Sequence, residues 1–90
     1  MAMIHLTVVT PKGLMLDEDV QRVVVRTTGG DVCILPHHID YAAALGEGEA
    51  RVTLADGTVR RAQVRGGMLH FASEVAQVIS SHFDWKEPAV

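Results

Sequence analysis

The sequence has little of what several protein classes depend on. Its single cysteine, Cys33, cannot form an internal disulfide, which fits a reducing compartment. Aromatic residues make up only 4% of the 90 residues, so a hydrophobic core has to be built from aliphatic side chains. No apolar run reaches the roughly 18 residues that a membrane span needs, and the N-terminus shows no signal-peptide pattern. We therefore expect a soluble chain that reaches a membrane only through protein partners.

Positive charge is also sparse. The chain has eight Lys and Arg residues against eleven Asp and Glu residues, for a net charge of −3. No basic stripe with interleaved aromatic residues is present, which disfavours nucleic-acid binding. The densest group, Arg60, Arg61 and Arg65, is typical of a strand with a solvated outer face.

The sequence contains instead a series of short alternating apolar segments. Valine-rich runs separated by Gly, Pro and Asp predict about nine strands, and no segment has a sustained helical period. Asp56-Gly57 predicts a hairpin, and the acidic run 17–19 predicts a turn between two short strands. A chain without helices must close or stack its sheets, so the fold class is predicted to be an all-β, antiparallel sandwich or flattened barrel. The expected strands are 4–9, 14–16, 20–26, 32–35, 41–45, 49–55, 58–65, 68–71 and 75–80.

The candidate site is the run Gly29-Gly30-Asp31-Val32-Cys33-Ile34-Leu35-Pro36-His37-His38. Cys33 stands in an apolar strand, so we expect a buried and inert thiol. His37, His38 and Asp40 are of metal-ligating type, but adjacent histidines diverge on extended backbone. A further ligand would have to come from Cys33, His5 or His70, and nothing in the sequence indicates that these converge.

Motifs of catalysis or cofactor binding are not found. Ser73, Ser80 and Ser81 lack a nucleophile elbow. Thr28-Gly29-Gly30 lacks the Lys-Ser/Thr of a phosphate loop. We therefore predict no catalytic, cofactor or metal residues, and a domain that acts by docking to other proteins.

The order of motifs is similar to that of one family. Leu6–Gly13 is followed by Val23–Val25, by the Gly30–His38 run, by Asp56-Gly57 and by Gly66–Phe71. Over about residues 3–81, this order resembles the N-terminal β-sandwich domain of the epsilon subunit of F-type ATP synthases, called delta in mitochondria. The resemblance implies a ten-stranded sandwich. We expect this domain to span residues 1–82 and a C-terminal tail to span residues 83–90, because Pro88 and the terminal position favour fraying.

The resemblance also implies a function. It indicates a non-catalytic central-stalk subunit that docks to gamma and to the c-ring, and that couples ion flow to ATP synthesis and hydrolysis on other subunits. It places the protein at the cytoplasmic face of a bacterial cell membrane. The positions that match the c-ring contacts are Thr28, Gly29, Gly30, Asp31 and His38. The family's C-terminal helical hairpin is not expected here, and neither is an ATP site of that type.

One sandwich face should be apolar where gamma covers it, because interface cores are depleted in charge. We expect Met68, Leu69, Val78 and Ile79 to contribute to this face. The Gly29–His38 run departs from the family pattern, because Cys33 and His37 stand where glycine is usual. Two alternatives remain open: a free-standing β-sandwich binding module, and a small metal-dependent enzyme using His37, His38 and Asp40.

Overall fold

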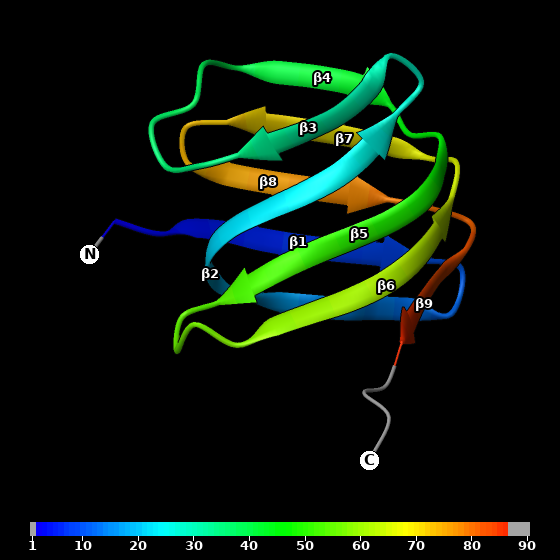
Figure 1. The fold of residues 1–90 in the computed structure, drawn as a ribbon, viewed down its shortest axis with the longest axis horizontal. Helices are drawn as coiled ribbons and strands as arrows, with labels where there is room; N and C mark the ends of the chain where they lie inside the picture. Colours follow the sequence, from blue (N-terminus) through cyan, green and yellow to red (C-terminus); the bar gives the residue numbers. More distant parts are fainter. Residues whose placement is uncertain (1, 87–90) are drawn as a thin grey trace.

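The structure, a computed structural model, describes residues 2–86 and folds them into nine strands (Figure 1). This confirms the all-β prediction, and no helix in the described range could cross a membrane. The strands are β1 (Ile4–Thr10), β2 (Gly13–Thr27), β3 (Gly30–Ile34), β4 (Tyr41–Ala44), β5 (Glu47–Leu54), β6 (Val59–Arg65), β7 (Met68–Ala72), β8 (Val75–Ile79) and β9 (Phe83–Lys86).

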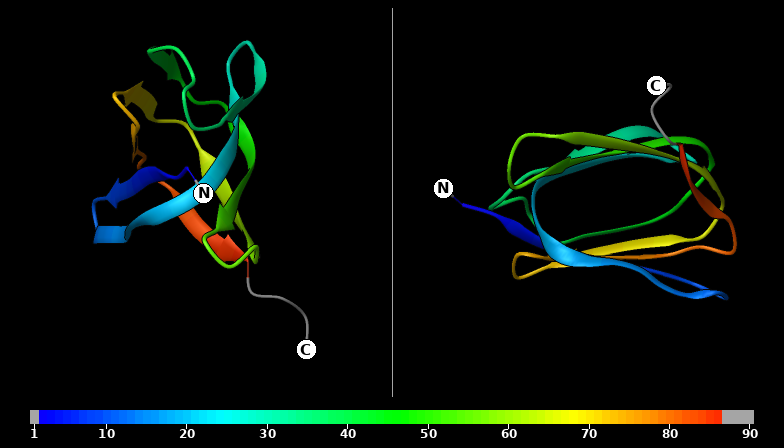
Figure 2. Two further views of the ribbon diagram at one scale, coloured as in Figure 1. Left: turned by 90° about the vertical axis from the view of Figure 1, so that its left-hand side faces the viewer. Right: turned by 90° about the horizontal axis from the view of Figure 1, so that it is seen from below.

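The strands form two layers that share β2. The hydrogen-bonded path runs β4-β7-β8-β1-β2-β5-β6-β9, and β3 pairs with β2. The first half of β2 pairs with β1, and the second half pairs with β3 and β5. The path therefore folds over at β2 (Figure 2). We call the layer with β4, β7, β8 and β1 the β1 layer, and the layer with β3, β5, β6 and β9 the β5 layer.

The predicted turn at residues 17–19 is wrong. Asp17, Glu18 and Asp19 stay in the ladder opposite Thr7, Leu6 and His5, so β2 runs on for 15 residues. Their acidic side chains are exposed, and an exposed face tolerates charge without breaking the strand. The register against β5 shifts between Val20 and Arg22, where a bulge bends β2 from one layer into the other.

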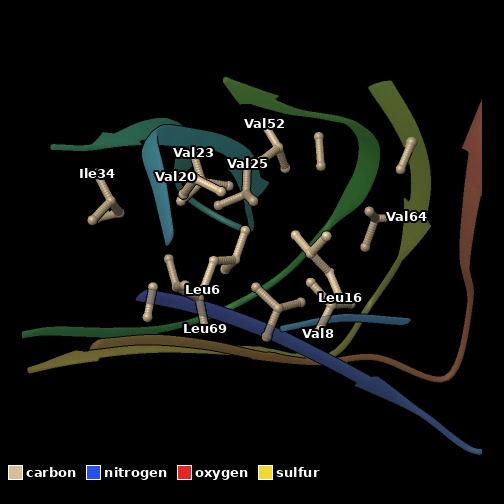
Figure 3. Close-up of a cluster of buried hydrophobic side chains, with 14 of the residues drawn as sticks. Leu6, Val8, Leu16, Val20, Val23, Val25, Ile34, Val52, Val64 and Leu69 are labelled. Carbon is tan, nitrogen blue, oxygen red and sulfur yellow. The ribbon is translucent and has the colours of Figure 1, made fainter. Parts of the chain in front are cut away.

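The core lies between the layers and is largely aliphatic, as predicted from the scarcity of aromatic residues. Buried side chains from both layers meet there (Figure 3). Val23 and Val25 are buried on the central half of β2, between β3 and β5, which confirms the central position predicted for the valine run. The labelled side chains are Leu6, Val8, Leu16, Val20, Val23, Val25, Ile34, Val52, Val64 and Leu69.

The Asp56-Gly57 hairpin is confirmed. Gly57 has φ 90°, and the Leu54 N–H donates to the Thr58 carbonyl at 2.7 Å. Two other expectations are corrected. The sheet is mixed rather than antiparallel, because β1 and β8 run parallel. The sheet also continues past residue 82, where the tail was expected to begin.

The added strand is β9, which pairs with β6. Trp85 is partly buried against the core and lies edge-on to Phe83 with ring centroids 4.9 Å apart. Arg60 stacks over the Trp85 ring, 3.8 Å from its centroid. Aromatic packing therefore holds residues 83–86 of the expected tail against the sandwich. Residues 87–90 lie outside the described range.

Candidate functional site

The Gly29–His38 run starts with a tight turn between β2 and β3. The Thr27 hydroxyl donates to the Gly30 carbonyl at 2.7 Å and accepts from the Gly29 N–H at 3.1 Å. Gly30 has φ 122°, a conformation that side chains disfavour. The turn is thus fixed by one buried threonine, while Thr28, Gly29 and Gly30 are exposed at its tip.

Asp31 already has a partner within the chain. It lies directly across from Arg26, whose Nε donates to its Oδ1 at 2.6 Å. This hydrogen bond is the main cause that lowers the pKa of the Asp31 carboxyl and raises the pKa of Arg26. Both side chains are about half exposed, so the pair orients the loop more than it stabilises the fold.

The other end of the run is tied to the β7–β8 turn. His37 has φ 68°, and its N–H donates to Oε1 of Glu74 at 2.8 Å. Ser73 and Glu74 also have positive φ, at 51° and 66°, as the two central residues of a primed hairpin turn require. No local pattern in the sequence indicates this link, because it joins residues 37 positions apart.

The two adjacent histidines differ in exposure. His37 is largely exposed, whereas His38 lies edge-on to Tyr41 and Phe71, with ring centroids 5.9 Å apart in both cases. His38 is half-buried rather than fully outward, and the most exposed apolar side chain of this loop is Ile39. Sequence reasoning missed Ile39, although its place between two polar residues in a loop was a usable signal.

The five predicted c-ring positions fall into two groups at opposite ends of β3, on the side of the molecule where β3 and β4 lie (Figure 1). Residues 28–31 are at one end, and His38 follows the other end. The Thr28 N–H donates to the Ala44 carbonyl at 3.1 Å, which joins the β2–β3 turn to β4. We call this side, made by β3, β4 and the loops at their ends, the β3/β4 edge.

Cys33 is exposed, not buried as expected. Its neighbour Ile34 takes the inward position, so the alternation of β3 turns Cys33 outward, opposite Val24. Within residues 2–86, no group of three or more His, Cys, Asp or Glu side chains is arranged to hold a metal ion. His37, His38 and Asp40 therefore do not form a metal-binding group among these residues.

The four predicted gamma contacts divide into two pairs. Met68 and Ile79 are directly opposite each other on β7 and β8, and each is 51% exposed. Leu69 and Val78 are likewise opposite each other, but they are 0% and 1% exposed and belong to the core. Only Met68 and Ile79 are therefore available to a partner.

Met68 and Ile79 are part of a longer apolar row on the outer face of the β1 layer. The strand register places Ala44 beside Met68, Val9 beside Ile79, and the exposed Leu14 beside Val9. A hollow of about 380 Å³ adjoins the row between Val9, Pro11 and Ile79. Sequence reasoning missed Val9 and Leu14, because the parallel β1–β8 pairing that brings them to Ile79 was not expected.

The comparisons with known proteins agree over nearly the whole chain. The family described as ATP synthase, Delta/Epsilon chain, beta-sandwich domain matches residues 3–86. The ATP synthase epsilon chain of Alkaliphilus oremlandii is 33% identical over 83 residues, which are 92% of this chain and 61% of that protein. The sodium-ion-specific epsilon chain of Propionigenium modestum is 34% identical over 88 residues, covering 97% and 64%. This chain therefore spans about three fifths of the length of these relatives.

Solved structures show the same fold. A chain in the mitochondrial ATP synthase of Euglena gracilis, from a structure of OSCP, F1 and the c-ring, superposes with a TM-score of 0.89 at 23% identity. The match covers 94% of this chain and 54% of that one. A chain of the Tetrahymena thermophila mitochondrial enzyme, from a structure of its central stalk and c-ring, gives 0.74 at 16% identity, covering 88% and 63%.

Proposed function

This chain belongs to the delta/epsilon-chain β-sandwich family of ATP synthases, and from that premise we propose that it is a central-stalk subunit of an F-type ATP synthase. It docks to gamma and to the c-ring, and it couples ion flow through the ring to ATP synthesis and hydrolysis on other subunits. It has no catalytic role of its own. The family match over residues 3–86 carries the proposal, because it spans every strand of the sandwich.

The gamma surface that we propose is the apolar row on the β1 layer. Met68 and Ile79 form its centre, and Leu14, Val9 and Ala44 extend it across five strands. Exposed apolar side chains gathered on one face are typical of a surface that a partner covers. Leu69 and Val78 support this surface from the core side.

The c-ring contact that we propose is the β3/β4 edge. Its loops carry Thr28, Gly29, Gly30 and Asp31 at one end, and His38 at the other. Ile39, which is 79% exposed, adds an apolar contact beside His38. Because Arg26 holds Asp31, a basic group on the ring would share this carboxylate rather than find it free. Asp31 would then contribute to register more than to affinity.

The cellular location follows from the same assignment. The curated relatives named above are bacterial epsilon chains. A subunit of their kind that contacts gamma and the c-ring would be peripheral to the cell membrane on its cytoplasmic face. Its attachment there would depend on protein partners.

The experiment that tests the function is direct binding to an ATP synthase gamma subunit from the same organism, measured by calorimetry. Met68→Asp should weaken binding by about tenfold or more, since a buried charge at an interface centre costs over about 1.4 kcal/mol. Ala55→Asp is the matched control, because Ala55 is exposed in the turn between β5 and β6 and lines neither hollow of the surface. It should change binding by less than about twofold.

Two results would count against the proposal in different ways. If the unaltered chain does not bind gamma, the central-stalk function is wrong. If it binds gamma but Ala55→Asp weakens binding as much as Met68→Asp does, the function stands and the assignment of the gamma face is wrong.

A further inference from the structure

The outer face of the β5 layer carries a hollow of about 360 Å³, on the side of the sandwich opposite the apolar row. We call it the arginine hollow. Three strands of the layer supply arginines to it, and apolar side chains lie between them. The residues that define it are Arg22, Arg51, Arg61, Val24, Leu35 and Val59.

Positive charge in the arginine hollow is in excess. Strand register sets Arg51 directly opposite Arg61, and like charges in that position destabilise a sheet. Glu49 is the nearby carboxylate that offsets this charge, and it contacts Lys86 at 3.0 Å and Arg61 at 3.5 Å. Among residues 2–86, neither Arg22 nor Arg51 has an ion-pair partner. The excess exists in a chain whose net charge is −3.

The carboxylate of Asp31, near the start of β3, does not neutralise the hollow either. Asp31 is engaged by Arg26 at 2.6 Å. Arg51 acts on Asp31 through its charge, as the smallest of the causes that lower the pKa of that carboxyl. Two guanidinium groups are thus left to face solvent over a concave surface.

The hollow is also partly apolar. Leu35 and Val59 are 46% and 45% exposed at its rim. Arginine is enriched at protein interfaces relative to the rest of the surface, whereas lysine is depleted. No aromatic side chain lines the hollow, so it offers no stacking platform for a nucleobase.

We propose that the arginine hollow binds an acidic segment of a partner protein. Carboxylates of the segment would pair with Arg22 and Arg51, whose planar guanidinium groups match carboxylate geometry. An aliphatic side chain of the segment would cover Leu35 and Val59. A small anion gains little from exposed guanidinium groups in water, whereas a segment gains from the apolar surface as well. This site goes beyond the proposed function, because its arginines lie on the layer that the gamma surface does not use and outside the β3/β4 edge, which the hollow only adjoins at Cys33 and Leu35.

The first test uses the full chain labelled with ¹⁵N and three probes: a short capped peptide of alternating glutamate and leucine, its glutamine counterpart, and inorganic phosphate. The acidic peptide should shift amide signals of β2, β3, β5 and β6 around the hollow. The glutamine peptide should bind about tenfold more weakly. Equal binding of both peptides, or phosphate binding as tightly as the acidic peptide, would overturn the proposal.

Two substitutions separate the site from general surface charge. Arg51→Gln should weaken binding of the acidic peptide by about fivefold to tenfold, as expected for the loss of one charged hydrogen-bonding group. Arg65→Gln is the matched control, because Arg65 is exposed on β6 but does not line the hollow. An equal loss in both variants would mean non-specific attraction and would refute the site. If Arg51→Gln melts at a lower temperature than the unaltered chain, Arg22→Gln takes its place.

Cys33 offers an independent readout, since it lines the same hollow and is the only cysteine. Iodoacetamide is neutral, so its reaction with the thiol reports access without competing for the arginines. The acidic peptide should slow alkylation of Cys33 by about threefold or more at saturation, through steric cover of the hollow. An unchanged rate at saturating peptide would place the peptide elsewhere and refute the proposal.

Discussion

The neighbouring residues Met68 and Leu69 allow a sharp test of which β7 side chains belong to the core and which to a surface. Leu69 is fully buried and opposite Val78, while Met68 is 51% exposed and opposite Ile79. Replacing a buried leucine by alanine costs about 2.7–5 kcal/mol, from lost transfer free energy and the cavity that remains. Met68→Ala leaves no enclosed cavity, so it should cost less than about 1 kcal/mol.

These costs are large against the stability that a domain of 90 residues has. Its free energy of unfolding is expected to be roughly 5–13 kcal/mol. Leu69→Ala should therefore remove a large part of it and lower the melting temperature by roughly 15–30 °C. Met68→Ala should lower the melting temperature by less than about 8 °C.

Urea unfolding followed by tryptophan fluorescence measures both variants. Trp85 is the only tryptophan, and its packing against Phe83 makes its emission sensitive to unfolding. The denaturant slope should be unchanged, so that the shift in midpoint reports stability alone. The reasoning is refuted if Leu69→Ala costs less than about 1 kcal/mol, or if Met68→Ala costs as much as Leu69→Ala.

Three further predictions concern Gly67, the ion-paired His5, and Asp31 near the start of β3. Gly67→Ala should lower the free energy of unfolding by more than about 2 kcal/mol, because an added Cβ would lie 2.2 Å from the Ile79 carbonyl oxygen at φ 121°. Gly66→Ala should lower it by only about 1 kcal/mol in the same urea assay, because no atom lies within 4 Å of the added Cβ. Equal losses in the two variants would contradict the clash at Gly67. His5 donates to Asp19 and Asp17, which raise its pKa above 6.5, so its contribution to stability is complete below pH 6.5 and is lost as the pH rises through the raised value. The melting temperature of His5→Gln should thus fall below that of the unaltered chain at low pH and approach it at high pH, and a gap that widens with pH would contradict this. Asp31→Lys should leave the circular dichroism spectrum unchanged while weakening coupling in the assembled enzyme, because its pair with Arg26 is exposed; a loss of the folded state would make Asp31 structural.

The strand segments were largely predictable, because alternation and turn residues are local signals. Gly66-Gly67 and Asp56-Gly57 mark bends in the sequence, and the structure has positive φ at Gly57, Gly66 and Gly67. The length of β2 was not predictable in this way. Whether the acidic run at 17–19 forms a turn or a strand depends on β1, which supplies ladder partners and places His5 between two of the carboxylates.

Exposure of single residues was harder to predict than the position of strands. Cys33 and Ile34 are neighbours of similar apolar character, and only the pairing of β3 with β2 decides which one faces the core. The same holds for Met68 and Leu69, where the sequence offered both as surface residues. A shift of one residue exchanges the two faces of a strand. When a strand is predicted correctly but its outward face is not, only about half of the residues proposed for its surface are exposed.

The scattered arginines show why the charge pattern of the sequence was a poor guide to the surface. Arg22, Arg51 and Arg61 are far apart in the chain, and no window of the sequence contains a basic stripe. The register of β2, β5 and β6 brings them to one hollow, while the apolar row collects on the other layer. Each strand buries one face in the core and leaves its outer face free to carry either apolar or charged side chains. Because β2 is shared, it contributes to the outer faces of both layers. The sandwich can therefore offer an apolar outer face for one partner and a cationic outer face for another, without a change in the core that holds them together.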